Sequence, residues 1–78
     1  MDITFDYSKL KGKIKEIFNT QRAFSKKLCI SEYSLYKKLN SQVSFTQKEI
    51  IKSSKLLNLQ PIDIPIYFFT EKVEKTQR

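Results

Sequence analysis

The chain has 78 residues, with fifteen Lys and Arg against eight Asp and Glu, so its formal net charge is +7. Because it has no His and one Cys, an internal disulfide and a Cys-based metal cluster are excluded, and few acid–base groups remain for catalysis. We therefore expect one small, basic, non-enzymatic domain without a metal or other cofactor, and its charge favours a polyanionic partner, usually nucleic acid.

The first predicted helix follows Asp6, a residue type that caps helices well. Its apolar residues recur at helical spacing and form one stripe, Leu10, Ile14, Ile17 and Phe18. The lysines between them read as a solvated face, with phosphate contact as the alternative; they are Lys9, Lys11, Lys13 and Lys15. Gly12 lies inside this helix, where Gly costs about 1 kcal/mol relative to Ala. A close approach of another helix would explain it.

Two short helices joined by a tight turn follow. Thr20 is expected to cap the first, over residues 21–28, and Ser31 the second, over residues 32–40. Both helices have apolar residues one turn apart, and the inward-facing set with the turn is Phe24, Leu28, Ile30, Leu35 and Leu39. Cys29, in the turn, is expected to be a small buried residue.

The fourth helix has a capping box, in which Thr46 and Glu49 each satisfy a backbone N–H of the other. The connection before it places Phe45 in the core, and Asn58 is a reasonable stop. Three residues are expected on its buried face, Ile50, Ser54 and Leu57. After Pro61 the chain is apolar and β-prone, and a turn of helix, an extended segment and an edge strand all stay open. Residues 71–78 form a charged tail.

The string Gln21-x-x-Phe24-Ser25-x-x-Leu28-Cys29-Ile30-Ser31-x-x-x-Leu35-x-x-x-Leu39-Asn40 resembles the helix-turn-helix of phage Cro and repressor proteins. Three flanking strings add to the resemblance to small Cro-like phage regulators: residues 5–10, Thr46-Gln47-Lys48-Glu49-Ile50, and Ile64-Pro65 with residues 67–70. The resemblance implies an all-α, compact four- to five-helix bundle of the lambda repressor-like DNA-binding class. Residues 1–70 would form this single domain, with the motif at 20–40 and a short apolar C-terminal extension.

The resemblance also implies a function, sequence-specific binding of double-stranded DNA as a phage or prophage transcriptional repressor. The helix at residues 32–40 would lie in the major groove of a palindromic operator. Base edges would be read by Glu32, Tyr33, Tyr36 and Lys37. Backbone contacts would come from Gln21, Arg22, Lys26, Ser31, Lys38, Asn40 and Lys48. A homodimer, at least on DNA, would use Ile64, Ile66, Tyr67, Phe68 and Phe69.

Other interpretations stay open beside this one. Glu32 would also favour a helix N-terminus without touching a base, and the apolar C-terminal residues would also pack on their own domain. A protein-binding adaptor or antirepressor would reuse the same fold, with Tyr33, Tyr36 and Phe45 as its contact patch. No apolar run is long enough for a membrane span, and the first residues lack a signal-peptide pattern. We expect a protein of the bacterial cytoplasm, near the nucleoid, without a membrane or small-molecule partner.

The sequence departs from the family pattern at two positions. Ser25 stands where the family usually has Ala, a conservative change. Cys29 stands where the family usually has Gly, in a turn that commonly needs a positive φ. Either Cys29 accepts a left-handed conformation or the turn is built differently.

Overall fold

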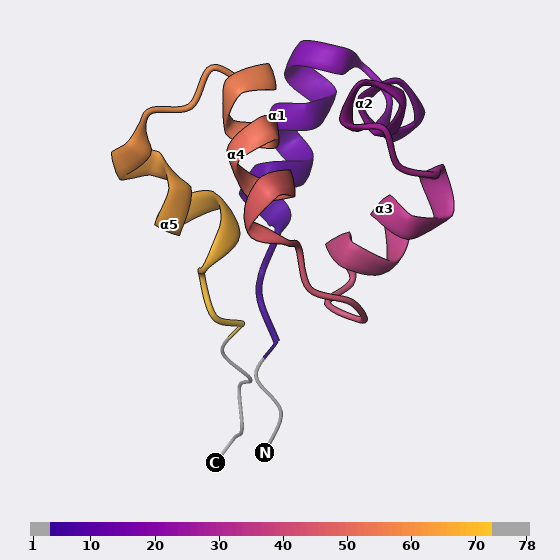
Figure 1. Cartoon of the computed structure of the whole chain (residues 1–78). Helices are drawn as coiled ribbons and strands as arrows, with labels where there is room; N and C mark the ends of the chain where they lie inside the picture. Colours follow the sequence, from indigo (N-terminus) through magenta and orange to yellow (C-terminus); the bar gives the residue numbers. More distant parts are fainter. Residues whose placement is uncertain (1–3, 73–78) are drawn as a thin grey trace.

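The computed structural model describes residues 4–72, and within them the secondary structure is helical apart from one isolated β-bridge (Figure 1). Five α-helices and one 3₁₀ turn follow in order: α1 (Ser8–Phe18), α2 (Gln21–Leu28), α3 (Glu32–Leu39), α4 (Gln47–Leu56), η1 (Pro61–Asp63) and α5 (Ile64–Phe68). The predicted all-α class and helix number are confirmed. None of these helices is long and apolar enough to cross a membrane.

The core confirms most of the predicted apolar stripe pattern. Its buried apolar residues are Tyr7, Leu10, Ile14, Phe24, Leu28, Leu35, Leu39, Leu57 and Phe68. Ile17 was expected in the α1 stripe, but it is 41% exposed. Leu10, Ile14 and Phe18 are spaced four apart, so the line that they form turns slowly around the helix. Ile17 is left at the edge of the stripe that lies away from Phe18. Phe18 instead ends the stripe, with its ring 5.2 Å from that of Phe24.

The helices begin where the cap residues predict. The Ala23 N–H donates to Thr20 Oγ1 (3.1 Å), and the Ser34 N–H donates to Ser31 Oγ (3.0 Å). The capping box of α4 is complete. At α1 the cap position itself is Tyr7, and Asp6 accepts the Ser8 N–H from one residue earlier (2.8 Å).

Three helices end in the same way, on a left-handed residue that is not glycine. Cys29, Ser41 and Asn58 have φ of 66°, 62° and 58°. In each case the next N–H returns to a carbonyl five residues back, as for Ile30 to the Ser25 carbonyl (3.1 Å). This is the Schellman arrangement, which Gly usually closes. Gly12 is in a helix instead, and no atom of residues 4–72 lies within 4 Å of a Cβ added there, so a close approach of another helix does not explain it.

The apolar C-terminal stretch is helical, so the extended conformation left open for it is wrong. Pro61 and Pro65 lie in the first turns of η1 and α5, where a missing N–H costs nothing and a fixed φ suits a helix. Phe68 packs edge-on against Phe45, with ring centroids 5.3 Å apart. Phe45 packs against the core, as expected, and its other edge contact is Tyr7.

The two ends of the described chain lie side by side below the helices (Figure 1). Phe5 and Glu71 form an isolated antiparallel bridge, flanked by Asp6 N–H to Thr70 O (2.7 Å) and Lys72 N–H to Thr4 O (2.9 Å). We call residues 4–6 and 70–72 the terminal ribbon. Of the charged tail predicted over residues 71–78, only Glu71 and Lys72 lie within the described residues.

Candidate functional site

Helices α2 and α3 cross steeply at one side of the molecule. In Figure 1, α2 is seen nearly end-on while α3 lies across the view, at the opposite side from α5. The connection between them is three residues long. Its first residue, Cys29, has a left-handed conformation, which is the first of the two alternatives considered for this position, where the family usually has Gly. A short, fixed turn of this kind holds the axis of α3 relative to α2 and leaves one side of α3 in solvent.

Cys29 is exposed, so its expected burial is wrong. The Cys29 side chain lies on the surface, next to α4. There Lys52 Nζ, on α4, lies 3.3 Å from Cys29 Sγ. Lys52 therefore lies beside the α2–α3 turn, which the sequence did not indicate because the two residues are 23 positions apart.

The outward side of α3 carries two stacked tyrosines. Tyr33 is 66% exposed and Tyr36 51%, and their rings stack with centroids 6.3 Å apart and planes 13° from parallel. Lys37 Nζ lies 5.0 Å from the Tyr33 ring centroid, a cation–π distance. Glu32, at the first turn, is exposed. We call these four residues, Glu32, Tyr33, Tyr36 and Lys37, the α3 face; the structure brings all four predicted base-reading residues together on it.

Lys38 does not belong to the outward side, which corrects its expected role as a backbone contact. It is 7% exposed, and its Nζ lies 3.0 Å from Glu49 Oε1 and donates to the Ser44 carbonyl (3.1 Å). Leu35 and Leu39 define the buried side of α3, and Lys38 follows the same turn inward. Its ammonium group therefore joins α3 to the beginning of α4.

The Glu49 carboxylate is at the centre of this junction. Burial raises its pKa, but hydrogen bonds from the Thr46 N–H and from Lys38, with the Lys38 charge, outweigh burial and lower the pKa overall. Glu49 thus stays ionised while it serves both the capping box and the ion pair with Lys38. The contact between α3 and the beginning of α4 therefore runs through this carboxylate.

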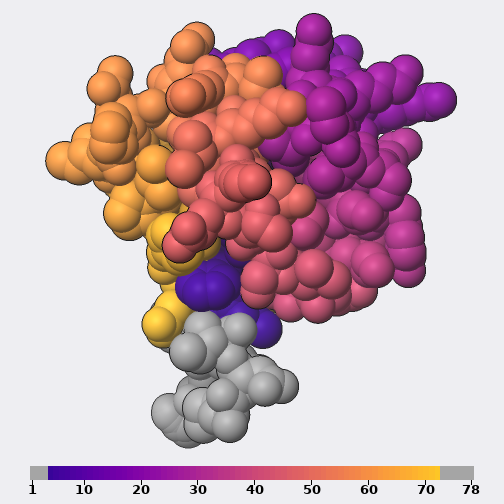
Figure 2. All heavy atoms as spheres, in the orientation of Figure 1, coloured from indigo at the N-terminus to yellow at the C-terminus, as the bar shows by residue number. Residues whose placement is uncertain are grey.

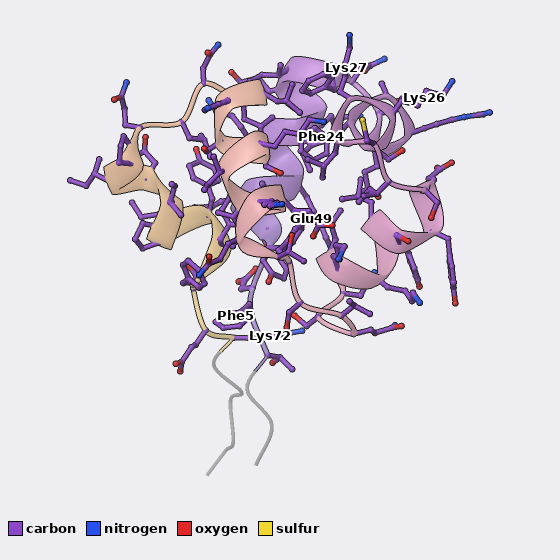
Figure 3. All side chains as sticks on the ribbon, in the orientation of Figure 1. Phe5, Phe24, Lys26, Lys27, Glu49 and Lys72 are labelled. Carbon is purple, nitrogen blue, oxygen red and sulfur yellow. The ribbon has the colours of Figure 1, made fainter. Side chains whose placement is uncertain are left out.

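The other predicted backbone-contact residues lie mostly in solvent. Gln21 is half-buried, and the exposed members are Arg22, Lys26, Ser31, Asn40 and Lys48. The Asn40 amide donates to the Tyr36 carbonyl (2.8 Å), so it closes the end of α3. Figure 3 shows Lys26 and Lys27 extending from α2 into solvent. Lys27 was not in the predicted set, although it lies beside Lys26 on the same short helix.

The α5 residues predicted for a dimer interface do not share one face. Phe68 is buried in the core, and Ile64 and Tyr67 are half-buried and pack against it. Phe68 therefore cannot contact a second copy in this conformation, because α5 uses that side to cover α1 and α4. Ile66 and Phe69 are exposed, and Ile62, which was not predicted, is 79% exposed.

Within residues 4–72, His, Cys, Asp and Glu do not gather in any group of three that would hold a metal ion. What the described structure offers is a small helical scaffold that projects one short helix with an aromatic, partly charged face. Such a face is suited to recognition of a macromolecule.

The chain belongs to the family described as "Protein of unknown function (DUF739)", which it matches over residues 3–71. It is similar to the solution structure of the modulator of repression (MOR) of the temperate bacteriophage TP901-1 from Lactococcus lactis, with a TM-score of 0.76 and 44% sequence identity. That similarity covers 91% of this chain and 96% of the other. No curated protein matches the chain. The likeness to Cro and repressor proteins stays a prediction.

Proposed function

We propose that this protein modulates phage repression by binding a repressor protein through the α3 face. The observation that carries the proposal is the exposed stacked pair of Tyr33 and Tyr36. The similar solved protein is a modulator of repression, which supports a role beside a repressor. The α3 face is then the surface with which the partner is held.

The chemistry of the α3 face favours a protein surface as its occupant. Tyrosine rings supply a large, rigid contact area at low entropy cost, and tyrosine is enriched among residues that dominate protein interfaces. Lys37, the one cation on the face, lies over the Tyr33 ring. Lys38, the other cation of α3, is held by Glu49. A helix that reads DNA needs several free polar groups aimed at base edges, whereas the large exposed groups of this face are the two tyrosine rings.

The test is a binding titration with the repressor encoded by the same phage or prophage. We expect Tyr33→Ala to weaken the complex by about 30-fold or more, because central aromatic residues of interfaces contribute about 2 kcal/mol or more. The matched control is Ile62→Ser, which removes an exposed apolar side chain from the opposite side of the molecule. Equal affinities for wild type and Tyr33→Ala would overturn the proposal.

A second candidate function is direct binding of operator DNA, with the steep α2–α3 crossing as the observation that favours it. An exposed short helix pinned in this way can enter a major groove, and the exposed Arg22, Lys26 and Lys48 would supply phosphate contacts. A homodimer would then have to use the exposed Ile62, Ile66 and Phe69, without Phe68.

Salt dependence separates the two candidates. Direct binding through about six to eight phosphates gives a log–log slope of about −5 to −7 for the protein alone on duplex DNA. We expect the protein alone to bind DNA weakly and without sequence preference. A selected palindromic sequence, bound with that steep slope and lost in Lys37→Ala, would make DNA the partner of the α3 face.

A further inference from the structure

A second concave site lies away from the α3 face, where the terminal ribbon meets α1 and the end of α3. It is a pocket of about 260 Å³. Its walls come from three parts of the chain: residues 4–8 with Lys11, residues 39–41, and Lys72. Of these residues, only Asn40 belongs to a predicted partner surface, the set of DNA backbone contacts. The pocket therefore needs its own explanation.

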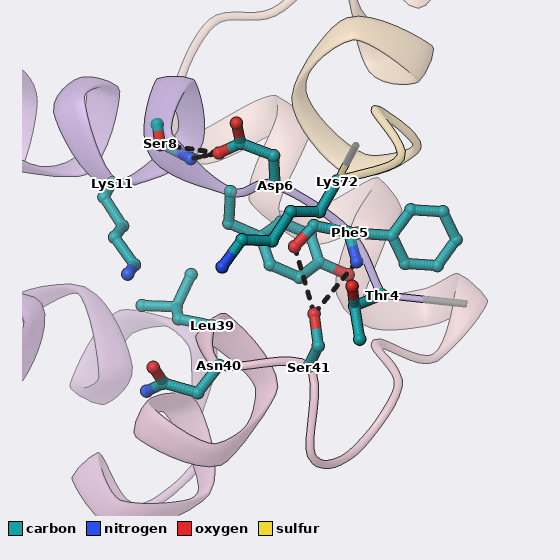
Figure 4. A pocket seen from close by; sticks show the side chains of 10 residues that line it. Thr4, Phe5, Asp6, Ser8, Lys11, Leu39, Asn40, Ser41 and Lys72 are labelled. Atoms are coloured by element: carbon teal, nitrogen blue, oxygen red, sulfur yellow. Dashed lines mark hydrogen bonds between the residues drawn. The ribbon is translucent and has the colours of Figure 1, made fainter. Parts of the chain in front are cut away.

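Three of the side chains that line the pocket carry nitrogen donors: Lys11, Asn40 and Lys72. Figure 4 shows the Lys11 and Lys72 side chains reaching toward the same space from different elements, with the Asn40 amide beside it. Among residues 4–72, neither lysine forms an ion pair with a carboxylate. Two ammonium groups that converge without such a partner favour a negatively charged occupant.

One carboxylate, Asp6, also lines the pocket, but it is already engaged. Both the N–H and the hydroxyl of Ser8 donate to Asp6 Oδ1. These hydrogen bonds hold the pKa of the Asp6 carboxyl below its ordinary value, and the charges of Lys72 and Lys11 lower it further. With two positive charges and one negative charge, the pocket keeps a net positive charge when it holds no ligand.

The floor of the pocket is fixed before any ligand arrives. Ser41 Oγ accepts the Phe5 N–H and donates to the Phe5 carbonyl, both at 3.1 Å. This reciprocal pair of hydrogen bonds connects the residue after α3 to the backbone of the terminal ribbon. The donors that a ligand would meet are thus held on connected elements, which lowers the entropy cost of binding.

We propose that this pocket binds a small dianion, of the phosphate monoester or dicarboxylate class, through Lys11, Lys72 and the Asn40 amide. The oxyanion accepts hydrogen bonds from both ammonium groups, which come from α1 and from the terminal ribbon. Binding would join these two elements across the end of α3. The proposal does not depend on the nature of the partner at the α3 face, because no residue of that face lines the pocket.

The experiment is an NMR titration of the ¹⁵N-labelled full chain with inorganic phosphate, and separately with succinate, at constant ionic strength set by chloride. We expect saturating amide shifts centred on Lys11, Asn40 and Ser41. In Lys11→Gln/Lys72→Gln we expect binding at least about tenfold weaker, since hydrogen bonds to charged groups contribute enough for about that factor each.

The matched control is Lys9→Gln/Lys55→Gln, which loses the same charge at exposed positions that do not line the pocket. It should bind as the wild type does. Should the Lys11/Lys72 variant be poorly folded by its spectrum, Lys11→Gln alone replaces it. Shifts that never saturate with either ion, shifts centred on the lysines of α2 and α4, or equal binding by the two double variants would each overturn the proposal.

Discussion

Left-handed backbone in this protein is found at residues with side chains, whereas its one glycine is helical. Asn19, Cys29, Ser41 and Asn58 have positive φ, and Gly12 lies in the middle of α1. Asn adopts this region more readily than other residues, but Cys and Ser have no such advantage. Backbone strain and lost helix propensity therefore both reduce the stability of the fold at identifiable positions.

Gly12→Ala should stabilise the protein by about 1 kcal/mol. The added Cβ meets nothing within 4 Å, and Ala restricts the unfolded chain more than Gly does. Chemical denaturation measured by circular dichroism gives the change in the free energy of unfolding. An unchanged or lower stability would show that this helix is limited by something other than propensity.

Cys29→Gly should also stabilise, by about 1 kcal/mol, because Gly adopts φ of 66° without a Cβ clash. Cys29→Ala is the control, since it removes the thiol and keeps the Cβ; it should bring no gain. A lower thermal midpoint for Cys29→Gly than for wild type would mean that the thiol contact with Lys52, at 3.3 Å, outweighs the backbone strain.

At the scale of elements, the junction between α3 and α4 is one of the contacts that hold the α3 face in place. Lys38, Glu49 and Thr46 link the two helices through one ion pair and a capping box. Because Lys38 is buried and Glu49 half-buried, water screens this pair less than a surface pair. Removing one partner leaves the other in a poorly hydrated site.

Lys38→Met should therefore destabilise the protein by about 2 kcal/mol, less than for a fully buried pair because Glu49 keeps some solvent contact. Lys27→Met, at an exposed position of α2, should change stability by less than about 0.5 kcal/mol. Urea denaturation of both variants makes the comparison. Similar values for the two would indicate that the Lys38 pair contributes nothing to the fold.

Acid should weaken the same junction. The pKa of Glu49 is lower in the folded chain than its ordinary value of 4.5, so its contribution is complete above that value. The contribution is lost as the pH falls through the lowered folded pKa, when the carboxyl is protonated. The unfolding free energy of Glu49→Gln should depend less on pH than that of wild type below about pH 4.5. Identical pH profiles would exclude Glu49 from the acid response.

For the molecule as a whole, local signals in the sequence predicted more than long-range ones. Thr20, Ser31 and Thr46 cap helices by accepting a backbone N–H three residues later, so the helix starts are visible in the sequence. Leu35 and Leu39 are one helical turn apart, so the buried side of α3 is visible as well. The helix starts and the apolar side of α3 were predicted correctly because residues within one turn determine them.

What the sequence did not indicate depends on packing between distant segments. The burial of Lys38 requires Glu49 beside it, and the helix at residues 64–68 requires a core that accepts Phe68. The pocket at Lys11 forms only when Lys72 returns to the N-terminal residues. Tyr33 and Tyr36 are three residues apart on a helix, so their proximity can be read from the sequence. The kind of macromolecule that the two rings contact cannot.

At this same scale, Figure 2 shows a compact body with the described part of the terminal ribbon at one end. Figure 1 places α3 and α5 at opposite sides of that body. This separation lets one spectrum distinguish binding at the α3 face from contact at α5. The most direct measurement is therefore an NMR titration of the labelled protein with its phage repressor in the absence of DNA. We predict broadening or shifts concentrated on residues 32–40; changes concentrated on residues 62–69 with α3 unaffected would contradict the account.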